Sequence, residues 1–142
     1  MLRSPPRAHA QYIGGTPPAG TSFLSFTTTG VASAAGFSTF FTCTNPYGFN
    51  INIAVQVFDQ NGSAMNASPA LSVPPGGTTQ FATGNAAPFV PDQILSPVNS
   101  FTKGAAKIWS DQKNIHCEAF LACTAGLHDL RLIAQGKKQR GD

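Results

Sequence analysis

Charged side chains are scarce in this sequence of 142 residues. Lys, Arg, Asp and Glu make up 11% of it, against about 25% in ordinary soluble domains. Between Arg7 and Lys103 only Asp59 and Asp92 are charged, so Ser, Thr, Asn, Gln, Gly and Ala must fill the exposed positions. A surface of this kind has little charge repulsion to keep copies of the chain apart. The composition favours an extracellular or self-associating protein over one in a crowded cytosol.

Several classes of protein are disfavoured by what the sequence lacks. The net charge of +3 comes from the two ends of the chain, and no basic stripe interleaved with aromatics runs through its middle. No apolar run is long enough to cross a bilayer as a helix. No His or Cys residues have the spacing of a zinc finger. We therefore expect no nucleic-acid partner, no membrane-spanning segment, and no metal or other cofactor.

The clearest local pattern lies at residues 50–59. Ile51, Ile53, Val55 and Val57 fall on one parity, and polar or small residues fall on the other. Alternation with a period of two and β-branched apolar residues predicts a strand with one buried face. The Asn61-Gly62 pair that follows predicts a tight hairpin turn in which both residues take positive φ angles. We expect this strand to be the central one of an antiparallel sheet.

The remaining patterns also predict strands and no helix. Segment 84–103 has no pattern, and 65–69 lacks alternation. Further strands are expected at 22–29, 36–45, 70–73, 78–83, 104–110, 115–124 and 127–134. Seven or eight short strands at near-regular spacing predict an all-β antiparallel sandwich. The sandwich would span residues 21–135, between an extended Pro/Gly-rich arm (1–20) and a basic carboxy-terminal tail (136–142).

Turn sequences and cysteine positions together suggest a fold family. A Cys-bearing strand precedes Phe-Asp-x-Asn-Gly (58–62), Pro-Pro-Gly-Gly-Thr (74–78) and a late Cys-bearing strand. Over residues 22–134 this order resembles the small immunoglobulin-like sandwich domains of bacterial secreted proteins. The shared motifs are turn chemistry rather than a site, so the resemblance implies a fold and no activity.

Three cysteines allow one disulfide. Cys43 and Cys117 lie on the inward parity of well-patterned strands, which predicts a bond between the two sheets. Closing that loop would stabilise the fold by about 4 kcal/mol. Cys123 shares the parity of Cys117 and is an alternative partner for Cys43. Three buried free thiols are a further alternative.

The sequence shows no set of side chains that could act together in catalysis. His116 and Glu118 flank Cys117, but neighbours on a strand point to opposite faces, so neither can activate its thiol. His128 could approach Cys123, with no third group to complete a triad. We therefore predict that the chain is not an enzyme.

Aromatic residues are the remaining candidates for a binding surface. Trp109 and Phe120 fall on outward parities, and Phe89 lies in the long loop. These three form a candidate binding surface for a sugar ring or another subunit. A second layer of core is the alternative. In the arm, Tyr12 and Ile13 are candidate subunit contacts.

Three functions fit these observations. The first is a non-catalytic extracellular subunit that assembles into a filament or surface layer by passing its amino-terminal arm to the open sheet edge of a neighbour. Its partners would be copies of itself. The second is a monomeric carbohydrate- or protein-binding module. A small hydrolase using Cys117, with His116 or His128, ranks third.

Overall fold

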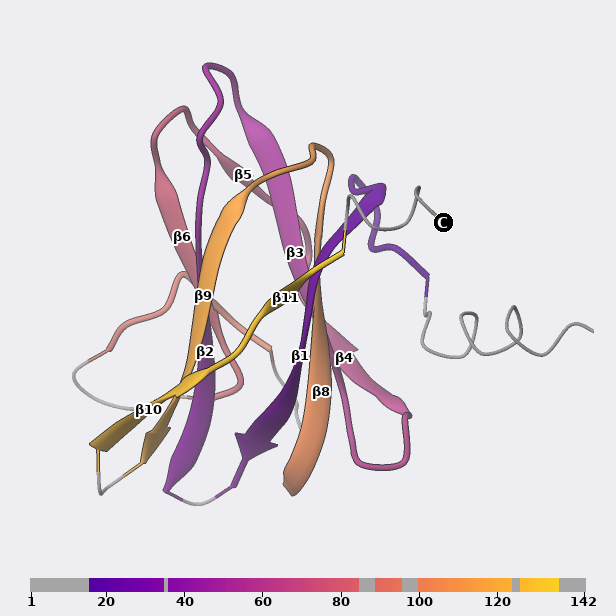
Figure 1. Ribbon diagram of the computed structural model, residues 1–142, viewed down its shortest axis with the longest axis vertical. Helices are drawn as coiled ribbons and strands as arrows, with labels where there is room; N and C mark the ends of the chain where they lie inside the picture. Colours follow the sequence, from indigo (N-terminus) through magenta and orange to yellow (C-terminus); the bar gives the residue numbers. More distant parts are fainter. Residues whose placement is uncertain (1–15, 35, 85–88, 96–99, 124–125, 136–142) are drawn as a thin grey trace, which may run out of the picture.

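The computed structural model describes residues 16–34, 36–84, 89–95, 100–123 and 126–135. These residues form two sheets packed face to face, with no helix among them, which confirms the predicted all-β sandwich (Figure 1). Tyr12, Ile13 and the basic tail lie outside the described residues.

The described residues contain eleven strands, several of them very short. In chain order they are β1 (Phe23–Ser33), β2 (Phe37–Thr44), β3 (Ile51–Phe58), β4 (Ala64–Ala67), β5 (Leu71–Val73), β6 (Thr78–Ala82), β7 (Gln93–Ile94), β8 (Phe101–Ser110), β9 (His116–Cys123), β10 (Gly126–Leu130) and β11 (Ile133–Ala134). One sheet has the order β11-β1-β8-β3-β4, with β5 also paired to β3. The other has the order β10-β9-β2-β6-β7. All pairs are antiparallel except β6 and β7.

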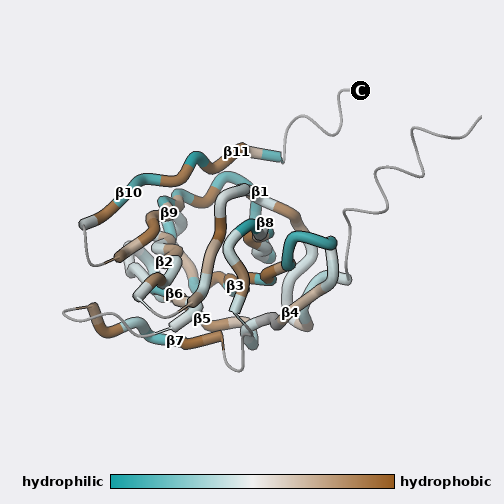
Figure 2. The backbone as a smooth tube through the Cα atoms, turned by 90° about the horizontal axis from the view of Figure 1, so that it is seen from below, coloured by the Kyte–Doolittle hydropathy of each residue, from teal (hydrophilic) through white to brown (hydrophobic). Residues whose placement is uncertain are grey.

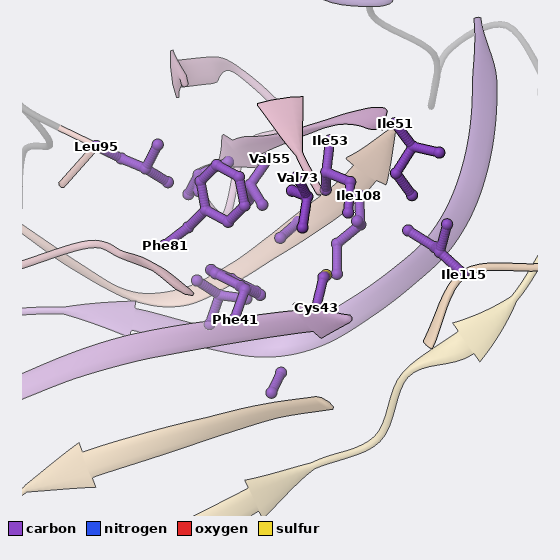
Figure 3. Packing of buried hydrophobic residues seen from close by; sticks show 14 of the residues in the cluster. Phe41, Cys43, Ile51, Ile53, Val55, Val73, Phe81, Leu95, Ile108 and Ile115 are labelled. Atoms are coloured by element: carbon purple, nitrogen blue, oxygen red, sulfur yellow. The ribbon is translucent and has the colours of Figure 1, made fainter. Parts of the chain in front are cut away.

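The alternating pattern of β3 gives the strand one buried face, as predicted. Ile51, Ile53, Val55 and Val57 are each at most 1% exposed, and all four belong to the main core. In Figure 3 the labelled members of this set face Phe41 and Cys43 from the opposite sheet. β3 has partners along both edges, although β8, between β1 and β3, is the middle strand of the sheet.

Asn45 holds the chain where it crosses from β2 in one sheet to β3 in the other. Its side chain is fully buried, and its Nδ2 donates to the carbonyl oxygens of Phe49 (2.7 Å) and Val73 (2.9 Å). Its Oδ1 accepts the Tyr47 N–H at 2.7 Å. A buried amide with this many partners fixes the path of the loop, because any other arrangement would leave polar atoms unpaired.

The hairpin after β3 differs from the predicted turn. Gly62 has a φ of 82°, whereas the φ of Asn61 is not positive. Among the described non-glycine residues, only Asn114 has a positive φ. The Gly62 N–H donates to Asp59 O, and the Asp59 N–H donates to Ser63 O. A four-residue turn whose last residue is a glycine in the left-handed region gives a bulged hairpin, so positive φ angles at both Asn61 and Gly62 are not needed.

The strand predicted at 127–134 is two strands in different sheets. β10 pairs with β9, and β11 pairs with β1 after the chain crosses between the sheets. Figure 2 shows β10 and β11 as one run along a side of the sandwich. The Thr28 hydroxyl donates to the Arg131 carbonyl oxygen at 2.7 Å, which anchors this crossing. Segment 65–69, which lacks alternation and predicted only a poor return strand, contributes to β4, because pairing with β3 needs no alternation at the edge of a sheet.

The disulfide joins Cys43 and Cys117, as predicted. The expected position between the two sheets is wrong, however. The two residues are direct cross-strand partners on β2 and β9 of one sheet, with their Cα atoms 4.1 Å apart. Cross-strand neighbours on one face of a sheet lie close enough for such a bond. A shared inward parity therefore cannot distinguish a disulfide between the two sheets from one within a single sheet.

The described end of the amino-terminal arm lies on its own domain. The carbonyl oxygen of Thr16 accepts from Gln56 Nε2 at 3.3 Å, and that of Gly20 accepts from Asn52 Nδ2 at 3.2 Å. Both donors lie on β3. For residues 16–20, the expectation that the arm contacts a neighbouring subunit rather than its own domain is therefore wrong.

Candidate functional site

A groove of about 640 Å³ lies on the outer face of the sheet that contains β1, β8 and β3. Ile133 of β11 and Gln135, the residue after β11, line it, and the β3–β4 hairpin supplies Phe58, Asp59, Gln60 and Gly62. Its other lining residues come from β1 and β8: Leu24, Thr27, Thr28, Thr29, Lys103, Gly104, Ala105, Ala106, Lys107 and Trp109.

Small side chains on the middle strands give the groove its depth. Ala105 on β8 is the cross-strand partner of Thr29 on one side and of Phe58 on the other. Larger side chains, Trp109 on β8 and Ile133 on β11, also line it. Because successive residues of a strand point to opposite faces, residues 103, 105, 107 and 109 of β8 share the outer face.

Lys107 is the only cation on the described lining that is buried. Its side chain is 3% exposed, and Nζ lies 5.3 Å from the centre of the Phe58 ring and 5.8 Å from that of Trp109. Its cross-strand partners are Thr27 and Gln56. Burial disfavours the ammonium form and lowers the pKa of Lys107 from 10.5 to about 8. Aromatic faces attract a cation, which partly offsets that cost.

Trp109 is fixed by a chain of side-chain bonds. Its indole N–H donates to Gln56 Oε1 at 2.9 Å, and Gln56 in turn donates to Thr16 O. Trp109 lies on the outer face, as its parity predicted, yet it is only 7% exposed. It therefore forms part of the groove wall rather than an exposed platform.

Among the described lining residues, Asp59 is the single carboxylate, and it bonds within the hairpin. Asp59 Oδ1 accepts the N–H groups of Asn61 (2.9 Å) and Ser63 (3.0 Å). Lys103, at the other end of the outer face of β8, is exposed. The described lining residues thus carry one anion and two cations.

The other two predicted aromatics lie on the opposite side of the sandwich. Phe89 and Phe120 pack on Phe40, with ring centres 5.2 Å apart in each pair. Ala82 and Ala122 complete this cluster, which faces away from the main core. Phe40 is fully buried by it. The structure thus separates Trp109 from Phe89 and Phe120, and the latter two form a small second core.

Phe58 and Lys107 are groove residues that sequence reasoning did not select. The signal was present, because Lys107 shares the outward parity of Trp109. A lysine two positions from a tryptophan is ordinary on an exposed sheet face, however. Strand pairing places Phe58 of the neighbouring strand near its ammonium group, beside the Trp109 ring.

The residues considered for hydrolysis do not assemble. Cys117 is in the disulfide and has no thiol, while His116 and Glu118 are exposed on the other face of β9. His128 is opposite Leu121 rather than Cys123. Within the described residues, no three His, Cys, Asp or Glu side chains gather closely enough to hold a metal ion. That part of the chain also has no helix long and apolar enough to span a membrane.

No family model matches the sequence, and no significant similarity to a curated protein or to a solved structure is found.

Proposed function

We propose that this protein is a non-catalytic extracellular binding module that holds a saccharide in the outer groove. One observation carries the proposal: two aromatic rings, Phe58 and Trp109, line a groove together with several hydrogen-bonding side chains. A disulfide in a chain of this size is compatible with an extracellular location.

The chemistry of the lining matches that of a sugar. A sugar ring has apolar C–H faces, which pack on aromatic rings, and hydroxyl groups, which need donors and acceptors. Thr27, Thr29, Gln60 and Gln135 supply such groups along the groove. Its volume of about 640 Å³ falls in the range of roughly 300–1,000 Å³ of small-molecule sites.

The same lining favours binding over hydrolysis. Most glycoside hydrolases use a pair of carboxyl groups on either side of the scissile bond. The described residues of the groove include one carboxylate, Asp59, and its Oδ1 accepts two hydrogen bonds within the hairpin. Among the described lining residues, no second acid is placed to act with it.

Blocking the groove tests the proposal. Ala105→Phe places a ring on the groove floor, at a partly exposed strand position that accepts an aromatic residue. Ser72→Phe makes a change of similar bulk on β5, at an exposed position outside the groove. The binding of oligosaccharides from plant, fungal and bacterial extracellular polysaccharides is measured on an array, and hits are titrated by calorimetry.

We expect at least one saccharide to bind the native protein, with a loss of tenfold or more in Ala105→Phe and little change in Ser72→Phe. Equal binding by all three proteins would place the site elsewhere. An absence of binding across the whole panel would refute the proposed function.

Self-assembly is a second candidate, favoured by an edge strand. β10 is an outer strand of its sheet, and its Leu127 side chain is 56% exposed. Unpaired backbone groups on such an edge can accept a strand from another chain. Since residues 16–20 bond to their own domain, the inserted segment would come from residues 1–15, which include Tyr12 and Ile13.

Deletion of residues 1–15 tests assembly without touching those bonds. The full chain should form filaments or large oligomers by electron microscopy and light scattering, and the shortened chain should be a folded monomer. A full chain that stays monomeric when concentrated would refute this candidate.

A further inference from the structure

We propose that a small cleft at one side of the sandwich binds a carboxylic acid that carries a single aromatic ring. The cleft has a volume of about 250 Å³ and is lined from both sheets, by β1 and Ala134 of β11 on one and by His116 of β9 on the other. It is separate from the outer groove, since Leu24 is the only described residue that lines both. The proposal therefore does not depend on the saccharide module.

Apolar side chains make up most of the cleft wall. Ile115 is 2% exposed and belongs to the main core, and Phe26 packs against the same core. Figure 3 shows Ile115 at one end of the labelled core residues. Phe23, at the start of β1, is 36% exposed and also lines the cleft. The wall thus presents two aromatic rings and a branched side chain, against which the ring of a ligand can pack.

Lys113 and His116 add polar groups to this wall. Both side chains are exposed, and Lys113 Nζ lies 5.4 Å from the centre of the Phe23 ring. The Tyr47 hydroxyl donates to the Lys113 carbonyl oxygen, which ties the β8–β9 turn to the loop between β2 and β3. A ligand carboxylate beside Phe23 would meet the Lys113 ammonium group in a charge-assisted hydrogen bond, and an imidazole N–H is a second donor.

The charge of the cleft favours an anion. No carboxylate is among the described residues that line it. Asp111, in the same turn as Lys113, accepts the Asn52 N–H through Oδ1 at 3.0 Å. Glu118 follows His116 by two residues on β9, but it does not line the cleft. The described lining is therefore cationic, and a ligand of opposite charge is attracted to it.

The volume limits the ligand to one ring. An apolar cavity of roughly 150 Å³ accommodates benzene, whereas sites for drug-sized molecules begin at roughly 300 Å³. A cleft of about 250 Å³ accommodates one ring with a short acidic arm. Phenylacetate has this size and this chemistry.

Three probes separate the effect of the ring from that of the charge. The isotope-labelled full-length protein is titrated at pH 7 with phenylacetate, phenylacetamide or acetate, and its amide chemical shifts are followed by NMR. Phenylacetamide keeps the ring without the charge, and acetate keeps the charge without the ring. We expect saturable binding of phenylacetate, with the largest shifts at residues 23–26 and 113–116, and binding of the other two that is weaker by about fivefold or more.

Two results would refute the proposal. The first is an absence of saturable binding by phenylacetate, or shifts that lie away from the cleft. The second is an affinity for phenylacetamide equal to that for phenylacetate, because the anion would then contribute nothing.

Two variants test the role of the charge. Lys113→Met keeps the apolar stem and the carbonyl oxygen that Tyr47 contacts, and the preference for phenylacetate over phenylacetamide should disappear. Arg131→Met removes the same charge from an exposed position that does not line the cleft, and it should change affinity by less than about twofold. Equal losses in the two variants would mean a general electrostatic effect, and the inference about Lys113 would be wrong.

A third variant tests the role of the ring. Phe23→Leu keeps an apolar side chain at the exposed start of β1 and removes the ring beside Lys113. Its affinity for phenylacetate should fall by about threefold or more, and its circular dichroism spectrum checks that the fold is retained. A folded Phe23→Leu protein with native affinity would place the acid outside this cleft and overturn the proposal.

Discussion

Gly104 on β8 is a position where a single methyl group should destabilise the protein. A Cβ atom there would lie 2.4 Å from Cε2 of the Phe101 ring and 2.6 Å from the backbone carbonyl oxygen of Phe58. Neither neighbour can move freely, because Phe101 is 5% exposed and the Phe58 carbonyl belongs to the paired strand β3. Gly104→Ala therefore forces a shift of the ring or a separation of the strands.

The magnitude follows from these distances. Carbon atoms in contact are normally about 3.5–4.0 Å apart, so the ring must retreat by roughly 1 Å. Overpacking of a dense core costs about 1–3 kcal/mol. The smaller entropy of an unfolded chain with Ala in place of Gly returns about 0.4–1 kcal/mol. We expect Gly104→Ala to lower the free energy of unfolding by about 1 kcal/mol.

Urea unfolding with an intact disulfide measures this change. With a slope of about 1–3 kcal/mol per molar urea, the midpoint should fall by roughly 0.5 M while the slope stays the same. Gly48→Ala is the matched control, because a Cβ at Gly48 meets nothing within 4 Å and its φ is not positive. Its midpoint should equal that of the native protein or lie slightly above it. Equal midpoints for the two variants would show that the close packing at Gly104 is misjudged.

Three further predictions concern stability. Reduction of the bond between Cys43 and Cys117, which are 74 residues apart, should cost about 4 kcal/mol in the chain-entropy model. Thermal melts with and without reductant will show this, and an unchanged melting temperature would contradict it. Trp109→Phe leaves the buried Gln56 amide without its indole partner, at a cost of about 1–3 kcal/mol in urea unfolding. A change below 0.5 kcal/mol would indicate that water replaces the indole. Ile53→Ala, at a fully buried position of β3, should cost about 2–5 kcal/mol, and a loss near zero in the same assay would place the core elsewhere.

The strands with the strongest alternation were the most predictable. β3 was expected at 50–59 and spans Ile51–Phe58, and its buried face is the predicted one. β1 extends four residues beyond its expected end at residue 29, because β8 pairs with it as far as Ser33 across several register shifts. The immunoglobulin-like resemblance stays a prediction.

The candidate site was only partly predictable. Parity correctly placed Trp109 on an outer face, but it could not show that Trp109 and Phe120 face away from each other on different sheets. Which sheet a strand joins depends on pairing between distant segments, and the alternation of a strand is the same in either sheet. Phe89 lies in a stretch without any pattern, so its contact with Phe40 arises from tertiary packing alone.

The sequence by itself determined the all-β class and the buried face of β3, since both depend on local alternation. It favoured the pairing of Cys43 with Cys117 but left Cys123 as an alternative, and the structure decided between them. Only the tertiary structure decided that this disulfide lies within one sheet and that Lys107 lies between Phe58 and Trp109. The physical reason is that alternation specifies which way a side chain points, whereas its neighbours are specified by strand order and register. These depend on long-range pairings that no short stretch of sequence encodes.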